Sequence, residues 1–229
     1  MKLAGFVPLS LCDYPGRVAS VIFTQGCNFR CPWCHNAHLI PEEAPCPSGA
    51  LPPEPEAPLL ARLAERRGRV DSVVVTGGEP TLHAALPRFL RRLKDLGLRV
   101  KLDTNGARPD VLRGLLADGT LDFVAMDIKA PWHRYAELTG APSCDVAAVR
   151  AALALIASSG VAHQFRTTRV DPLLSEQDYA AIRAQVPPGS PHVWQAFRPP
   201  NESRATPQRS DSTHDHLEPS LFTLSPARA

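Results

Sequence analysis

The sequence predicts an α/β fold around a parallel sheet, because strand-like and helix-like segments alternate along most of the chain. Apolar runs of strand length recur, and each of them ends in glycine, cysteine or polar residues. The 229 residues are 44% hydrophobic and 21% charged, which is typical of a globular domain with its own core.

Six segments are expected to be strands, and helical segments separate them. The expected strands are 18–26, 71–78, 98–106, 121–129, 161–170 and 191–199, and the expected helices are 59–68, 82–97, 111–119, 146–160 and 175–186. Gly68 and Gly97 end two of these helices, and Ser175 with Asp178 resembles a capping box. The carboxyl ends of parallel strands share one edge of a sheet, so GCNFRC, TGGEP, DTNG and MDIK should meet there.

Two stretches depart from the alternation. Residues 41–58 form a proline-rich connector, and residues 200–229 are rich in Pro, Ser, Thr and charge. Such a composition buries too little apolar surface to order the chain. We therefore expect one core domain over 1–199 and a disordered tail over 200–229.

Charge and hydropathy exclude some partners. The net charge of +2 and the lack of a basic stripe argue against nucleic acid, and no apolar run approaches the ~20 residues of a membrane span. The N-terminus is a poor export signal, because Pro8 interrupts it and bulky Leu11 precedes Cys12. We expect a cytoplasmic protein, in which metal binding is more common than disulfide formation.

Cys27, Cys31 and Cys34 form the motif C-x3-C-x2-C, with no fourth cysteine nearby. Three thiolates on a [4Fe–4S] cluster would leave one iron open to a small molecule. A zinc site with His35 as fourth ligand is an alternative, but a histidine directly after Cys34 is poorly placed for it. Trp33 would shield the cluster, pack on a planar ligand or belong to the core.

The motif C-x3-C-x-aromatic-C followed by GGEP resembles the radical S-adenosylmethionine (SAM) superfamily, over residues 3–199. CPWCHN, TGGEP, DTNG and MDIK together resemble its glycyl-radical-enzyme activases. DYPG (13–16) is similar to the activating protein of anaerobic ribonucleoside-triphosphate reductase. The resemblance implies a partial (β/α)6 barrel of parallel strands, a [4Fe–4S] cluster on the three cysteines and SAM on the open iron.

The resemblance also suggests which residues receive SAM. Gly77 and Gly78 would let backbone approach the ligand, and Glu79, held extended by Pro80, would accept from the SAM ammonium group. Trp33, Asp103, Thr104, Asp127, Lys129 and Arg166 complete the expected cofactor-binding set.

The charged strand ends leave several roles open. Lys129 is the first candidate for the SAM carboxylate, and Arg166 is another, although a structural ion pair would explain Arg166 equally well. The two aspartates would contact the ribose, form strand-end salt bridges, or bind a monovalent cation as in similar activases. That cation site would consist of Asp103, Thr104, Asp127 and the backbone carbonyl of Met126.

The function implied is an oxidoreductase that cleaves SAM and installs a glycyl radical on a partner enzyme. The expected partner is anaerobic ribonucleotide reductase, with a flavodoxin- or ferredoxin-type electron donor. Alternatives are a pyruvate formate-lyase-type activase, a radical SAM enzyme acting on a small molecule, and a non-catalytic metal module. WQAFRP offers Trp194, Gln195 and Arg198 where pyruvate formate-lyase-like activases carry a late-strand histidine. Cys12, Cys46 and Cys144 are too scattered for a second cluster.

Overall fold

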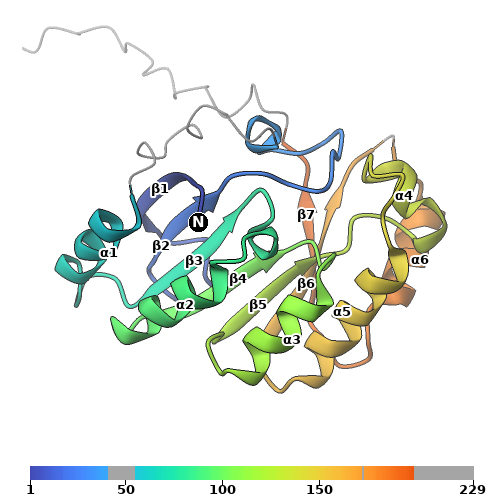
Figure 1. Ribbon diagram of the computed structural model, residues 1–229. Coiled ribbons are helices and arrows are strands. Elements are labelled where there is room, and N and C mark those ends of the chain that lie inside the picture. Colours follow the sequence, from blue (N-terminus) through green and yellow to red (C-terminus); the bar gives the residue numbers. More distant parts are fainter. Residues whose placement is uncertain (41–54, 172, 199–229) are drawn as a thin grey trace, which may run out of the picture.

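The computed structural model describes residues 1–40, 55–171 and 173–198, and these ranges form one seven-stranded sheet (Figure 1). The strands are β1 (Leu3–Ser10), β2 (Ala19–Thr24), β3 (Ser72–Gly77), β4 (Arg99–Thr104), β5 (Phe123–Asp127), β6 (Ala162–Arg169) and β7 (His192–Ala196). The expected tail 200–229, most of the proline-rich connector and Cys46 lie outside the described residues.

The sheet confirms the predicted parallel architecture. Its order is β1-β2-β3-β4-β5-β6-β7, and every neighbouring pair from β2 to β7 is parallel. In the part of the chain that the structure describes, β1 does not pair with β7, so the curved sheet is a partial barrel. All six parallel strands therefore end at one edge, where the polar motifs gather.

One strand was not predicted from the sequence. β1 pairs antiparallel with β2, which extends the sheet by an additional N-terminal strand. The register between the two strands is irregular on both sides of Gly5–Val7, and Pro8 lies within β1. A proline is tolerated there because β1 is an edge strand, so the backbone groups along one of its sides pair with no other described strand.

The helices are α1 (Glu56–Glu65), α2 (Leu86–Asp95), α3 (Pro109–Ala117), α4 (Tyr135–Leu138), α5 (Val146–Ser158) and α6 (Glu176–Gln185), with 3-10 turns at Ala37–Leu39, Pro80–Leu82 and Trp132–Arg134. The capping box of Ser175 and Asp178 is present at α6. The short turn and helix over 132–138 were not predicted. None of the described helices is long and apolar enough to cross a membrane.

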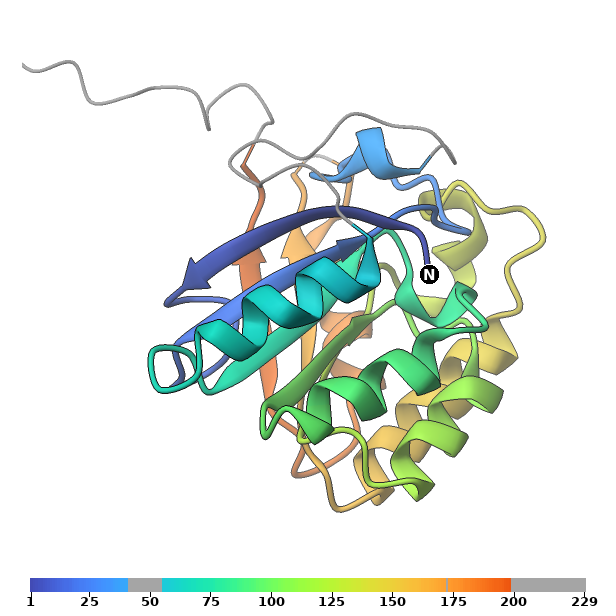
Figure 2. The ribbon, with the colours of Figure 1, turned by 60° about the vertical axis from the view of Figure 1, so that its left-hand side comes forward.

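The two faces of the sheet carry different clusters. Val73 and Val75 belong to the large core under the helices, whereas Val74 between them joins a smaller cluster on the opposite face. α1, α2, α3 and α5 lie over the same outer side (Figures 1 and 2).

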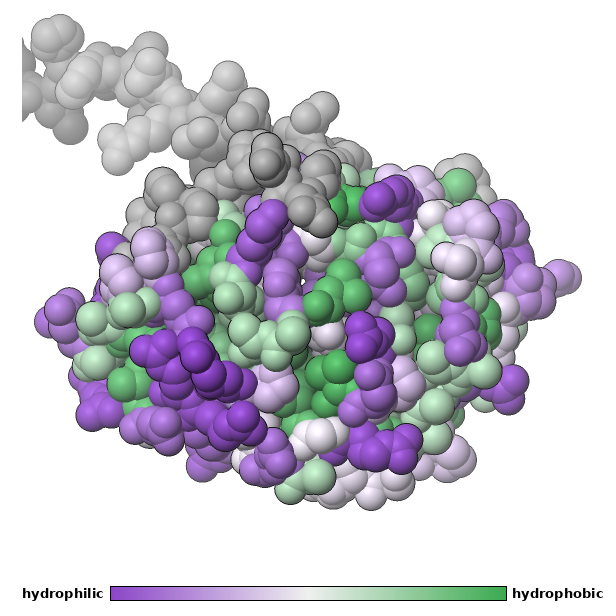
Figure 3. All heavy atoms as spheres, in the orientation of Figure 1, coloured by the Kyte–Doolittle hydropathy of each residue, from purple (hydrophilic) through white to green (hydrophobic). Residues whose placement is uncertain are grey.

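The outward side of α2 is strongly hydrophilic (Figure 3). Arg91 and Arg92 there pair with Asp118 and Glu56.

Candidate functional site

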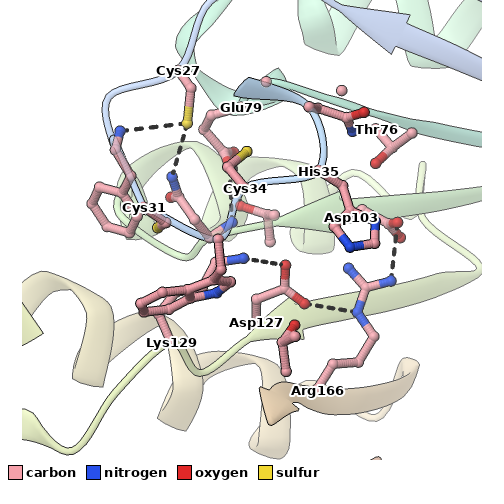
Figure 4. A pocket seen from close by; sticks show the side chains of 18 of the residues that line it. Cys27, Cys31, Cys34, His35, Thr76, Glu79, Asp103, Asp127, Lys129 and Arg166 are labelled. Carbon is pink, nitrogen blue, oxygen red and sulfur yellow. Dashed lines mark hydrogen bonds and ion pairs between the residues drawn. The ribbon is translucent and has the colours of Figure 1, made fainter. Parts of the chain in front are cut away.

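A cavity of about 270 Å³ lies at the carboxyl edge of the strands, beside the cysteine loop (Figure 4). The structure brings all the sequence-predicted cluster and cofactor-binding residues to its wall: Cys27, Cys31, Trp33, Cys34, Gly77, Gly78, Glu79, Asp103, Thr104, Asp127, Lys129 and Arg166. Met126 is not among the lining residues; its side chain is fully buried in the core beside Gly106. The strand-end motifs therefore converge on one space with the cysteines.

The cysteine loop presents three free thiols to this space. Main-chain bonds hold the loop at both sides, since Gly26 N donates to Leu39 O at 2.8 Å and Arg30 N donates to Thr139 O at 2.7 Å. Burial raises the pKa of Cys27 to about 11 and also raises that of Cys31. Both shifts favour the protonated thiol, so binding of iron by the thiolates would release protons.

The donor set fits a cluster better than a single ion. In the described ranges no group of three His, Cys, Asp or Glu side chains is placed to hold one metal ion. A [4Fe–4S] cluster separates its thiolates by the width of a cubane, and three thiols lining one cavity suit that arrangement. Trp33 is 5% exposed and belongs both to the core and to the cavity wall, so it remains compatible with each of its expected roles.

A chain of alternating charges crosses the floor of the cavity (Figure 4). Arg166 Nε donates to Asp127 Oδ1 at 2.8 Å, and Arg166 Nη1 donates to Asp103 Oδ2 at 3.1 Å. Lys129 Nζ donates to Asp127 Oδ2 at 2.8 Å, and Lys101 Nζ donates to Asp103 Oδ1 at 2.5 Å. The strand-end salt bridges left open by the sequence are thus present, and the chain has one more cation than anions.

Register explains this chain of charges. Asp127 of β5 lies directly opposite Arg166 of β6, on the same face of two parallel strands. Burial would raise the pKa of Asp127, but the charges of Arg166 and Lys129 hold it well below its usual range. Burial would likewise lower the pKa of Lys129, and Asp127 raises it above its ordinary value instead. All three groups are therefore charged at neutral pH.

The same pairing bears on the expected monovalent cation. Each of the four carboxylate oxygens of Asp103 and Asp127 already faces a cationic side chain. Thr104 Oγ1 donates to Glu79 Oε1 at 2.8 Å. These ion pairs compete with a monovalent cation for the same oxygens, and the expected cation site stays a prediction.

Glu79 is buried, with 1% of its surface exposed, and only neutral groups contact its carboxylate. Oε1 accepts from Thr81 N, Thr81 Oγ1 and Thr104 Oγ1, and Oε2 accepts from Asn105 N at 2.7 Å. Burial raises the pKa of Glu79, and these hydrogen bonds oppose that rise. Its acceptors are occupied by the protein, so contact with a SAM ammonium group stays a prediction.

Close packing against the protein's own backbone already requires glycine at Gly77 and Gly78. A Cβ on Gly77 would lie 2.3 Å from Thr24 N, and a Cβ on Gly78 would lie 1.9 Å from Gly26 O. Gly77 also has φ +120°. The missing side chains let the end of β3 press against the segment that leads into Cys27.

Sequence reasoning missed Lys101 and undervalued Asn105. Lys101 is 1% exposed and interrupts a buried strand two residues before Asp103, so the same-face spacing was the available signal. Asn105 was expected only to shape a turn, but its side chain reaches the cysteine loop.

The other candidate residues differ in whether they reach the cavity. Gln195 lines the cavity, whereas Trp194 packs on Tyr179 with ring centroids 5.5 Å apart. Cys12 is exposed and Cys144 is partly buried, and neither lines the cavity.

Comparisons with known proteins agree with this geometry. A relative from Methanocaldococcus jannaschii, named "Putative glycyl-radical enzyme activating enzyme", is 32% identical over 86% of this chain and 80% of its own length. A 7-carboxy-7-deazaguanine synthase from Methanopyrus kandleri is 31% identical over 52% of each chain.

Solved structures share the fold. Streptococcus suis SuiB bound to S-adenosylmethionine superposes with a TM-score of 0.58 at 16% identity, covering 78% of this chain and 40% of SuiB. Native anSMEcpe with bound AdoMet gives 0.57 at 16% identity, covering 76% and 50%. The chain thus spans half or less of the length of these structures.

The sequence of residues 21–179 matches the Radical SAM superfamily, a stretch that runs from β2 into α6 and includes all three cavity cysteines. The chain therefore belongs to the radical SAM enzymes, whose cofactors are a [4Fe–4S] cluster and SAM.

Proposed function

We propose that this protein is a glycyl-radical-enzyme activase. The observation that carries the proposal is the match to the Methanocaldococcus jannaschii relative along most of both chains. The described residues support it with an open cavity lined by three free thiols and a paired charge network. When bound, a reduced [4Fe–4S] cluster would give one electron to SAM, whose sulfonium bond would break into methionine and a 5′-deoxyadenosyl radical able to take a hydrogen atom from a backbone glycine of a partner.

Cys27, Cys31 and Cys34 would hold the cluster, because they are the free thiols on the cavity wall. Lys129 and Arg166 would receive the SAM carboxylate, because they are the Lys and Arg side chains that line the cavity among the described residues. The side chains of Asp103 and Arg166 are each only 13% exposed. This low exposure limits the water around an ion pair between Arg166 and the SAM carboxylate, and so strengthens their attraction.

The partner we infer is an anaerobic ribonucleoside-triphosphate reductase, with a flavodoxin- or ferredoxin-type protein as electron donor. DYPG at 13–16 favours this partner over a pyruvate formate-lyase-type enzyme, and so does WQAFRP (194–199), which carries no histidine although β7 begins with His192. Gln195 is the late-strand side chain at the cavity.

The test is an anaerobic reconstitution of the cluster, followed by SAM, a reductant and each glycyl-radical enzyme of the host. Electron paramagnetic resonance should show a glycyl radical on the reductase together with 5′-deoxyadenosine formation. Cys31→Ala should abolish both, whereas Cys12→Ala, which alters an exposed thiol away from the cavity, should retain them. SAM cleavage without a glycyl radical on any of these enzymes contradicts the proposal.

A small-molecule substrate is the second candidate, favoured by the match to a 7-carboxy-7-deazaguanine synthase over half of each chain. Turnover of a purine precursor by the reconstituted protein alone, without a partner protein, would support it over the activase.

A further inference from the structure

Asn105 connects the end of β4 to the cysteine loop. It is 5% exposed, and its side-chain orientation is set because Oδ1 accepts from Ala107 N at 2.9 Å. The amide nitrogen therefore faces the other way. Nδ2 lies 2.8 Å from Asn28 Oδ1 and 4.0 Å from Cys27 Sγ, within reach of a weak N–H···S contact.

The backbone of Asn105 is held as firmly as its side chain. Its N–H donates to Glu79 Oε2 at 2.7 Å, and Glu79 is itself tied to the cysteine loop, since Glu79 N donates to Gly26 O at 2.8 Å. A buried amide with both ends fixed loses little further freedom when it contacts a third group. The placement of Nδ2 beside Cys27 is thus built into the sheet edge.

Cys27 receives a second donor of the same kind. Phe29 N points at Cys27 Sγ at 3.4 Å, so a main-chain and a side-chain N–H flank one sulfur. Hydrogen bonds to cluster sulfurs stabilise the added negative charge of the reduced state and raise the reduction potential. The negative charge of the nearby Glu79 carboxylate acts in the opposite direction.

We propose that Asn105 is a positioning residue for the cluster, which fixes the cysteine loop and raises the cluster's reduction potential by donating to Cys27 Sγ. The inference needs the cluster but does not depend on which molecule the enzyme acts on.

Asn105→Asp is the variant with the largest expected effect, because it keeps the acceptor for Ala107 N and replaces the donor beside Cys27 by a carboxylate oxygen. Asn28→Ala is the matched control, because it removes the other partner of Nδ2 and leaves the amide in place. Both proteins and the wild type are reconstituted anaerobically, iron is counted, and the cluster is titrated potentiometrically by electron paramagnetic resonance without SAM or partner.

The midpoint potential should fall in Asn105→Asp and stay near the wild-type value in Asn28→Ala. An Asn105→Asp protein with a complete cluster at the wild-type potential overturns the inference. Asn105→Ala, reconstituted and titrated in the same way, removes the donor without adding charge and decides, because the carboxylate of Asn105→Asp lowers the potential by its charge alone. A lower potential supports the inference, and an unchanged one rejects it.

These outcomes are separable from those of the proposed function. A lowered potential with no glycyl radical on any partner leaves the role of Asn105 intact and rejects the activase. A glycyl radical on a partner together with an unchanged potential supports the activase and rejects the role of Asn105.

Discussion

Glu79 and Asp127 are carboxylates at the same edge of the sheet, yet they are stabilised in opposite ways. Glu79 is held by neutral hydroxyl and backbone donors, and burial raises its pKa. Asp127 is held by Arg166 and Lys129, whose charges overcome burial and lower its pKa.

The two carboxylates therefore have different roles at one site. Neutral donors fix Glu79 in place and tie β3, β4 and the cysteine loop together. The charged network around Asp127 can exchange one partner for a ligand, because its cations reach the cavity wall.

The largest effect on stability should come from removing the Glu79 carboxylate. Glu79→Ala should lower the free energy of unfolding by roughly 4 kcal/mol, because buried donors of Thr81, Thr104 and Asn105 lose their acceptor at about 1–3 kcal/mol each. Urea denaturation of the cluster-free protein measures it. Glu65→Ala, at an exposed position at the end of α1, should change stability by less than about 0.5 kcal/mol. A loss below about 1 kcal/mol at Glu79 would show that water replaces the carboxylate.

Removing Arg166 from the charged network should lower the free energy of unfolding less than Glu79→Ala does, and it should weaken ligand binding more. Arg166→Met should lower the free energy of unfolding by about 2 kcal/mol, because two carboxylates lose their shared cation beside a cavity that admits water. SAM affinity of the reconstituted protein should fall at least about tenfold. Denaturation and equilibrium binding test the two statements.

Arg169→Met supplies the control on the same strand. Its guanidinium pairs with Glu176 at an exposed site, where an ion pair contributes about 0–1 kcal/mol. Equal effects of the two substitutions would contradict a special role for Arg166.

The two carboxylates should respond to pH with opposite signs. The lowered pKa of Asp127 contributes stability above the unfolded value near 4, and this stability is lost as pH falls. The raised pKa of Glu79 contributes stability below about pH 4.3, which is lost as pH rises through the folded value.

Substitutions test each sign. Asp127→Asn should flatten the acid-side loss, and Glu79→Gln should flatten the decline toward neutral pH. Urea denaturation of the three proteins from pH 3 to 7 gives the slopes. Parallel curves for all three would contradict both assignments.

The sequence was sufficient for the parallel strands and the cavity wall, because strand ends share an edge whatever their detailed register. It was insufficient for β1, whose pairing with β2 is antiparallel and whose apolar pattern contains Pro8. It also could not decide between ligand contacts and salt bridges for Asp103 and Asp127. That choice depends on the register that places Arg166 opposite Asp127, and on Lys101 folding onto the same face.

The smallest expected effect concerns the monovalent cation, because the ion pairs of Asp103 and Asp127 compete with it for the same carboxylate oxygens. With every oxygen of Asp103 and Asp127 paired to a side chain, exchanging sodium, potassium or a bulky organic cation should change SAM affinity less than about twofold. Arg166→Met frees one oxygen on each carboxylate, and this variant should bind SAM better in small cations than in bulky ones. Binding titrations at constant ionic strength separate this effect from general screening. A wild-type protein that needs a small cation would mean that Arg166 leaves the two aspartates when SAM binds.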